Sequence, residues 1–249
     1  MNINPDSVDF FAQHAHEWWD EKGSNAPLHA LNWARLAFIC AQLSSAKEGH
    51  TKKRLQPLKG LRILDIGCGG GILAEPLCRL GGSVIGLDAG EQVIKVAKTH
   101  AHKMNLPIEY VQGDIATFKP EKLFDVVIAS EVIEHVENVS GFLAHCVQKL
   151  DKRGTLILST LNRTAFSYLL GIIAAERLLK WVPKGAHQWH KFLRPGEVAQ
   201  MLEAYGMELT AIQGMTYKPL QNEWQITNNL KVNYILAAKF YDSSLSPTQ

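Results

Sequence analysis

The fold of this chain is decided by residues 61–74, which read Leu61-Arg62-Ile63-Leu64-Asp65-Ile66-Gly67-Cys68-Gly69-Gly70-Gly71-Ile72-Leu73-Ala74. A run rich in leucine and isoleucine is followed by alternate glycines, and an apolar helical pattern begins directly after them. This order predicts a strand, a tight turn and the start of a helix. Glycines at positions 67, 69 and 71 permit positive φ and leave bare backbone, which is typical of a nucleotide-binding turn.

Two carboxylates accompany this turn. Asp65 precedes Gly67 by two residues, and Asp88 closes the next apolar run, at about the separation expected of a carboxylate that holds ribose hydroxyls. The glycine spacing differs from the dinucleotide fingerprint G-x-G-x-x-G. A carboxylate here suits a cationic ligand, so the motif Asp65-x-Gly67-x-Gly69-x-Gly71 resembles the first motif of class I S-adenosylmethionine-dependent methyltransferases. The glycine-rich turn of a dinucleotide-binding enzyme is the alternative.

Length and composition limit the class of protein. The 249 residues, 46% of them hydrophobic, can bury one large core, and we expect one domain with additions. A formal net charge of +2, with scattered lysines and arginines, argues against a nucleic-acid partner. Four cysteines without paired spacing favour a reducing compartment. The first residues carry no basic region followed by an apolar core, so we expect no signal peptide and a cytoplasmic location.

From residue 61 onward, strand patterns alternate with helix patterns. This alternation predicts an α/β fold, a doubly wound, seven-stranded, mainly parallel sheet of Rossmann-like type with right-handed crossovers. After the first two apolar runs, the expected strands are 108–112, 124–130, 154–160, 208–213 and 232–240. The expected helices are 7–20, 28–43, 74–80, 91–104 and 195–205. Ligands of such sheets bind beyond the carboxyl ends of the strands, where Gly67, Asp88, Asp114 and Ser130 fall.

We expect a single domain, 1–249, made of an N-terminal helical cap (1–43), a cofactor-binding core (60–160), a helical insertion after the fifth strand (161–206) and C-terminal strands (207–240). Residues 165–182 of the insertion approach the apolar content of a membrane span, but Glu176, Arg177 and Lys180 lie within them and argue against crossing a membrane. Either this helix is packed on several sides, or part of its surface meets a lipid or a bilayer interface.

Three residues directly after the fourth strand are candidates for chemistry. If this stretch is helical, Glu131, Glu134 and His135 share one face and could hold Mg²⁺ or Mn²⁺. The alternative is that the acidic residues favour a helix start through its dipole, while His135 bonds to a neighbouring carbonyl. A general base such as His135 could also ionise a phenol, of which only about one part in a thousand is oxyanion at pH 7.

Several blocks together look like the ubiquinone biosynthesis O-methyltransferase family, with similarity from about residue 9 to residue 240. These blocks are Trp18-Trp19-Asp20, Pro27-Leu28-His29, 65–73, 131–135, Ser159-Thr160-Leu161-Asn162-Arg163, Val182-Pro183-Lys184-Gly185 and Lys191-Phe192. Members methylate catechol hydroxyls of polyprenylated ring precursors, in an early and a late step. The tryptophan pair and the Ser159–Arg163 block are the specific parts, since many methyltransferases share the glycine turn.

The resemblance implies S-adenosylmethionine as cofactor and gives roles to single residues. Arg35 would contact the cofactor, Gly67 would line the turn, Asp88 would bind the ribose, Asp114 would reach the adenine amine, and Ser130 would lie beside the adenosine or methionine part. Glu131, Glu134 and His135 match the family's magnesium cluster. One departure is Trp33-Ala34, where relatives often have Asn-Pro. The first residue of the helix that carries Arg35 is therefore not fixed by the resemblance.

The resemblance also implies partners. A polyprenylated catechol is the expected substrate, and other ubiquinone-biosynthesis proteins are expected partners. Because the substrate partitions into membrane, residues 165–182 and Trp181 are expected to touch the bilayer or line the entry of the tail, which would make the protein peripheral on the inner membrane. His187, His190 and Lys191 either close over the ring or have ordinary surface roles. Two rival functions are a methyltransferase for a soluble acceptor and an idle, cofactor-binding subunit of a lipid-biosynthetic assembly.

Overall fold

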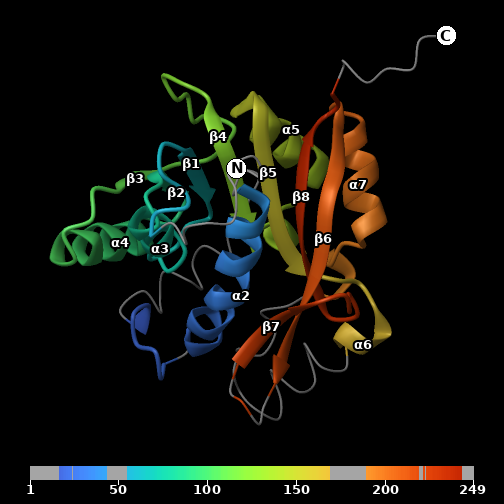
Figure 1. Cartoon of the computed structure of the whole chain (residues 1–249), viewed down its shortest axis with the longest axis horizontal. Helices are drawn as coiled ribbons and strands as arrows, with labels where there is room; N and C mark the ends of the chain where they lie inside the picture. The colour runs from blue at the N-terminus through green and yellow to red at the C-terminus, as the bar shows by residue number, and fades with distance from the viewer. Residues whose placement is uncertain are drawn as a thin grey trace.

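A computed structural model of the protein is organised around one eight-stranded sheet with the strand order β3-β2-β1-β4-β5-β8-β6-β7 (Figure 1). The structure describes residues 17–23, 25–43, 55–168, 189–218, 221 and 223–242. The strands are β1 Arg62–Ile66, β2 Ser83–Asp88, β3 Glu109–Gln112, β4 Phe124–Ser130, β5 Leu150–Leu161, β6 Met207–Lys218, β7 Glu223–Thr227 and β8 Asn233–Phe240. Strands β1 to β5 are parallel, whereas β8, β6 and β7 each pair antiparallel with their neighbours.

The predicted α/β fold is confirmed, but the predicted number of strands is wrong. The additional strand is β7, a short edge strand that pairs with the second half of β6. The sequence pattern ended the sixth strand at residue 213 because Gly214 follows there, yet β6 continues to Lys218. Trp224 and Ile226 of β7 are half-buried against the core beside helix α2 (Ala26–Leu43), and this tertiary contact, which a local pattern does not reveal, stabilises the extra strand.

Helices cover both faces of the sheet, as a doubly wound fold requires (Figure 1). Helices α2, α3 (Ala74–Arg79) and α4 (Glu91–Lys103) pack on one face, and α5 (Val139–Gln148) and α7 (Pro195–Glu203) pack on the other. The alternation of side chains along a strand produces these two cores. In β5, for example, Leu156 and Leu158 face α5 and α7, whereas Ile157 faces the side of α2.

Helix α2 is amphipathic at the spacing that its sequence predicts. Leu31, Ala34, Phe38 and Ile39 are buried against the sheet, and Trp33 on another side of the helix is 78% exposed. The pair Trp33-Ala34 lies inside the helix and does not interrupt it. Of the helix predicted at 7–20, only residues 17–20 are described, and they form a turn.

The predicted insertion is described only at its two ends. Helix α6 (Ala165–Ser167) begins with Thr164 as its capping residue, and the short helix η4 (Trp189–Lys191) follows at the other end. The indole Nε1 of Trp189 donates to the carbonyl of Thr164 at 2.9 Å, so the two ends meet. Most of the apolar segment 165–182 and His187 lie outside the described residues, and their roles stay predictions. No described helix has the length and apolar character needed to cross a membrane.

Candidate active site

The glycine turn lies where the order of the strands reverses. From β1 the chain goes on to β2 and β3 on one side, and then to β4 and β5 on the other, so the loops after β1 and β4 flank the crevice in which such sheets bind ligands. Gly67, Gly69 and Gly71 have φ of +67°, +52° and +94°, which side chains disfavour. The N–H of Gly67 donates to the carbonyl of Leu87 at 2.7 Å and ties the turn to β2.

Asp88, the last residue of β2, braces this turn. Its Oδ2 accepts a hydrogen bond from the N–H of Gly69 at 2.9 Å, and its Oδ1 accepts one from the N–H of Gly90 at 2.8 Å. Burial raises the pKa of Asp88, and these two N–H groups oppose the rise. Because each carboxylate oxygen has a second lone pair, both can also accept from the hydroxyls of a ribose.

Asp65 and Arg35 bring opposite charges into the protein at the same end of the sheet. In β1, Leu64 and Ile66 face α5 and α7, so Asp65 between them points to the side of α2, which carries Arg35. The residues are 2% and 4% exposed. Within the described part of the chain, Asp65 Oδ2 and the Nε and Nη2 atoms of Arg35 have no hydrogen-bond partner. Buried polar groups are normally satisfied, so these atoms keep an unused capacity for hydrogen bonds.

The charges of this pair affect each other. Burial raises the pKa of Asp65 to about 7, although the positive charge of Arg35 opposes the rise. Burial also lowers the pKa of Arg35, although the negative charges of Glu131 and Asp65 oppose this decrease. Nη2 of Arg35 lies 3.6 Å from Oε1 of Glu131, which fixes the guanidinium between the loops after β1 and β4.

The predicted shared helical face of Glu131, Glu134 and His135 is wrong. Glu131 has a φ of +57°, so the backbone leaves the helical region there, and only Ile133–His135 form a short 3₁₀ helix, η2. Each carboxylate instead bonds to β5: Ser159 Oγ donates to Glu131 Oε1 at 2.7 Å, and Thr160 Oγ1 donates to Glu134 Oε2 at 2.8 Å.

The arrangement of side chains does not support the predicted magnesium site. No group of three histidine, cysteine, aspartate or glutamate side chains in the described part of the chain is placed to hold a metal ion. Glu134 is 4% exposed, and burial together with the charge of Glu131 raises its pKa to about 8. His135 is half-buried, and its role as a base stays a prediction.

The remaining predicted positions follow neighbouring strands. Ser130 ends β4, and its hydroxyl shares a hydrogen bond of 2.8 Å with the hydroxyl of Ser159. Asp114 comes just after β3, and its Oδ1 accepts from the N–H of Ala116 at 2.9 Å, so this carboxylate also stabilises its own turn. Since β3, β2, β1 and β4 are adjacent in the sheet, the predicted positions Asp114, Asp88, Gly67 and Ser130 lie along one edge.

The two tryptophans of the Trp18-Trp19-Asp20 block contact the glycine turn. A Cβ atom added to Gly69 or Gly70 would lie well under 3.0 Å from the ring of Trp18, so this ring rests directly on the turn. The indole Nε1 of Trp19 donates to the carbonyl of Gly70 at 3.0 Å. The sequence did not predict the contacts that Ser159 and Thr160 make, although both lie in the block that distinguishes the family.

Comparison with known proteins identifies the family. A family model described as a methyltransferase domain matches residues 64–158. The ubiquinone biosynthesis O-methyltransferase of Azorhizobium caulinodans is 43% identical over 238 residues, which cover 95% of this chain and 94% of the relative. That of Paramagnetospirillum magneticum is 42% identical over 233 residues, covering 94% and 93%. The chain belongs to the ubiquinone biosynthesis O-methyltransferase family.

Solved structures agree with the fold of this ubiquinone biosynthesis O-methyltransferase family member. Magnesium protoporphyrin IX methyltransferase from Synechocystis, with bound S-adenosylhomocysteine, superimposes with a TM-score of 0.67 at 20% identity, covering 94% of this chain and 98% of that one. An S-adenosylmethionine-dependent methyltransferase from Clostridium acetobutylicum gives a TM-score of 0.63 at 12% identity, covering 93% and 99%. The family member therefore has the fold of S-adenosylmethionine-dependent methyltransferases, with the glycine turn between β1 and α3.

Proposed function

We propose that this chain transfers a methyl group from S-adenosylmethionine to a catechol hydroxyl of polyprenylated ubiquinone precursors, in both O-methylation steps. The names of its relatives support the reaction class. One observation in the crevice supports the cofactor: buried charges of both signs, on Asp65 and Arg35, have polar atoms without a hydrogen-bond partner among the described residues. An amino-acid group with an ammonium and a carboxylate would satisfy both residues.

The roles of the other residues follow from the same placement. Asp65 would accept from the ammonium group, and Arg35 would donate to the carboxylate. Asp88 would bind the ribose hydroxyls, while the positive φ of Gly67, Gly69 and Gly71 gives the backbone turn beside the ligand its shape. Asp114 would bind the adenine amine, and Ser130 would lie beside the adenosine or methionine part.

The proposed reaction requires little covalent chemistry from the protein itself. When bound, S-adenosylmethionine supplies a methyl group on a positively charged sulfur. Ionising a phenol at pH 7 costs about 4 kcal/mol, three pKa units at 1.36 kcal/mol each. We assign this proton to His135 as general base, because this half-buried histidine lies in η2, five residues after the end of β4. The remaining acceleration would come from holding the oxygen in line with the methyl group and sulfur.

The affinity for S-adenosylmethionine should depend on pH. The pKa of Asp65 is raised to about 7, so below pH 7 the carboxyl is mostly protonated and must lose its proton to bind an ammonium group. We expect the affinity to fall about tenfold per pH unit from pH 7 to pH 5.5. Calorimetry in buffers of different ionisation enthalpy would detect one proton released on binding. An affinity that is flat over this range would contradict the role of Asp65.

The rival functions are separated by two assays on the same protein. Calorimetry measures S-adenosylmethionine binding, and transfer of labelled methyl is then compared between a prenylated catechol and a short, water-soluble catechol, each with and without chelator. Transfer that prefers the prenylated catechol supports the proposal. Equal transfer to both favours a soluble acceptor, and binding without transfer favours an idle subunit. Transfer that is lost with chelator would instead support the predicted magnesium ion.

The polyprenyl tail leads us to propose a peripheral contact with the inner membrane and association with other ubiquinone-biosynthesis proteins. The apolar segment 165–182 is the proposed contact. Replacing Leu169, Leu170 and Ile173 by serine should weaken flotation with anionic liposomes. Leu123→Ser is the matched control, because this leucine is 47% exposed at the opposite end of β4. Unchanged flotation of the triple variant would contradict the contact.

A further inference from the structure

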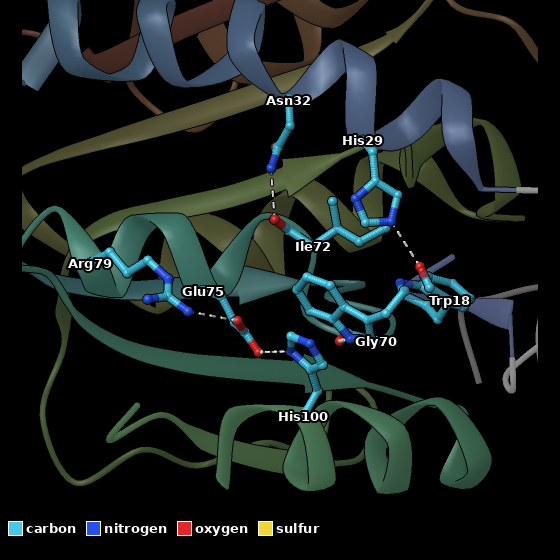
Figure 2. A network of polar contacts seen from close by, with 9 residues as sticks. Trp18, His29, Asn32, Gly70, Ile72, Glu75, Arg79 and His100 are labelled. Atoms are coloured by element: carbon cyan, nitrogen blue, oxygen red, sulfur yellow. Dashed lines mark hydrogen bonds and ion pairs between the residues drawn. The ribbon is translucent and has the colours of Figure 1, made fainter. Parts of the chain in front are cut away.

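A polar network outside the crevice holds the two tryptophans on the glycine turn (Figure 2). It involves side chains that none of the proposed chemical steps uses: His29 and Asn32 of α2, Glu75 of α3 and His100 of α4. The ring of Trp18 lies on Gly69 and Gly70. The N–H group of Gly69, next to this ring, donates a hydrogen bond to Asp88. Trp18 therefore stands beside the position at which the proposed cofactor meets the turn.

Helix α2 fixes this segment from one side. The Nε2 atom of His29 donates to the carbonyl of Trp18 at 2.9 Å. One helical turn further, Nδ2 of Asn32 donates to the carbonyl of Ile72 at 2.7 Å, so α2 is attached both to the tryptophan segment and to the end of the turn (Figure 2). These bonds set the distance between α2, which carries Arg35, and the glycines.

Helices α3 and α4 fix the segment from the other side. The ring of Trp19 stacks on His100, with centroids 3.6 Å apart and planes 11° apart, while Nε1 of Trp19 donates to the carbonyl of Gly70. The Nδ1 atom of His100 donates to Oε1 of Glu75 at 2.6 Å. The Glu75 side chain is 3% exposed and also lies 3.6 Å from Nη2 of Arg79. A buried carboxylate on the core thus orients the imidazole on which Trp19 rests.

We propose that His100 is a positioning residue for the cofactor. Acting through Trp19, His100 holds Trp18 over the turn. We call this arrangement the tryptophan clasp; it is formed by Trp18, Trp19, His29, Glu75 and His100. The clasp has to open for the cofactor to leave. The inference rests on the proposed function, because it needs a cofactor at the turn. Trp18 also packs on Ile72 and Val93 in a small apolar cluster, separate from the two cores on the faces of the sheet, so opening the clasp would break this packing and leave those two cores intact.

The rate at which S-adenosylhomocysteine leaves the protein tests this inference. His100→Ala removes both the stack and the bond to Glu75, and we expect dissociation, followed by stopped-flow displacement, to become about tenfold faster. His100→Phe keeps a ring for Trp19 but loses the bond, and an intermediate rate is expected. Trp19→Phe loses the bond to Gly70 and should accelerate dissociation about fivefold. In turnover, KM for S-adenosylmethionine should rise while kcat does not fall.

His102→Ala is the matched control, since this histidine lies on the same helix and is exposed. The proposal is overturned if His100→Ala and His102→Ala release the ligand at the same rate, or if His100→Ala lowers the melting temperature and leaves the dissociation rate unchanged. A wild-type protein that is folded but does not bind S-adenosylhomocysteine would instead refute the proposed function, and the clasp with it. Binding by the wild type with equal rates in all variants refutes the clasp alone.

Discussion

Replacing Asp65 by asparagine is expected to weaken S-adenosylmethionine binding by about a hundredfold. The carboxylate is buried, and Oδ2 has no hydrogen-bond partner among the described residues, so an ammonium group of the ligand would be its main compensation. Removing one partner of a buried, hydrogen-bonded charge pair typically costs about 3 kcal/mol or more, which corresponds to a factor of about one hundred. Calorimetry at pH 7.5 measures this change.

The same substitution should make the unliganded protein more stable. The pKa of Asp65 is raised from 3.8 to about 7, so between these values the folded state keeps a proton that the unfolded state has lost. Stability of the wild type therefore falls as pH rises through this window, by up to about 4 kcal/mol, three units at 1.36 kcal/mol each. Asparagine has no such titration, and urea unfolding at pH 5 and pH 8 would measure the difference.

Asp151→Asn is the control for both measurements, because this exposed carboxylate accepts from the N–H of Arg153 two residues further along and no buried carboxylate is removed. We expect no loss of affinity and no change in the pH dependence of stability. If Asp65→Asn binds S-adenosylmethionine as well as the wild type, the assignment of the ammonium group to Asp65 is refuted. If it is also less stable at pH 8, the buried charge is compensated within the protein itself.

Gly71→Ala is expected to cost about 2–5 kcal/mol of unfolding free energy. Two effects add: a φ of +94° disfavours any side chain, and the new Cβ would lie well under 3.0 Å from the hydroxyl of Tyr110. Tyr110 is buried, and its hydroxyl has no hydrogen-bond partner within the described ranges. Tyr110→Phe alone should therefore stabilise the protein by about 1 kcal/mol.

A double-mutant cycle separates the two effects. Combining Gly71→Ala with Tyr110→Phe removes the closest contact, that with the hydroxyl, leaves a ring carbon 3.1 Å from the new Cβ and keeps the disfavoured φ, so the pair should recover about 1–3 kcal/mol of the loss. Gly60→Ala is the control for backbone strain alone, since Gly60 has a φ of +88° and nothing lies within 4 Å of an added Cβ. Additive effects of the two substitutions in denaturant unfolding would contradict the steric contact.

The local patterns of the chain predicted most of the sheet and the glycine turn. Residues 61–74 specify their own conformation through alternating burial and glycines, and β4 has the predicted bounds. Patterns failed where a distant contact decides the structure. Strand β7 depends on α2, and the left-handed backbone of Glu131 accompanies bonds from Ser159 and a charge contact with Arg35. Those partners lie on other elements, so helical spacing within 131–135 was a poor guide.

For the site, residue type was a better guide than spacing. Asp65 and Asp88 were singled out because carboxylates beside a glycine turn suit a cation and a ribose, and both lie at the edge of the sheet that the topology requires. No sequence pattern predicted the proposed positioning role of His100. A histidine on an amphipathic helix is common, and the contacts that distinguish His100, its stack on Trp19 and its bond to Glu75, come from residues on other elements.

The hydrogen bond from Trp189 to Thr164 has a consequence for how this family can diversify. It joins the residues that flank 169–188, so these two flanks are held together by a contact of their own in addition to the sheet. Exchanging the intervening sequence between relatives should therefore leave the strands and the glycine turn unchanged.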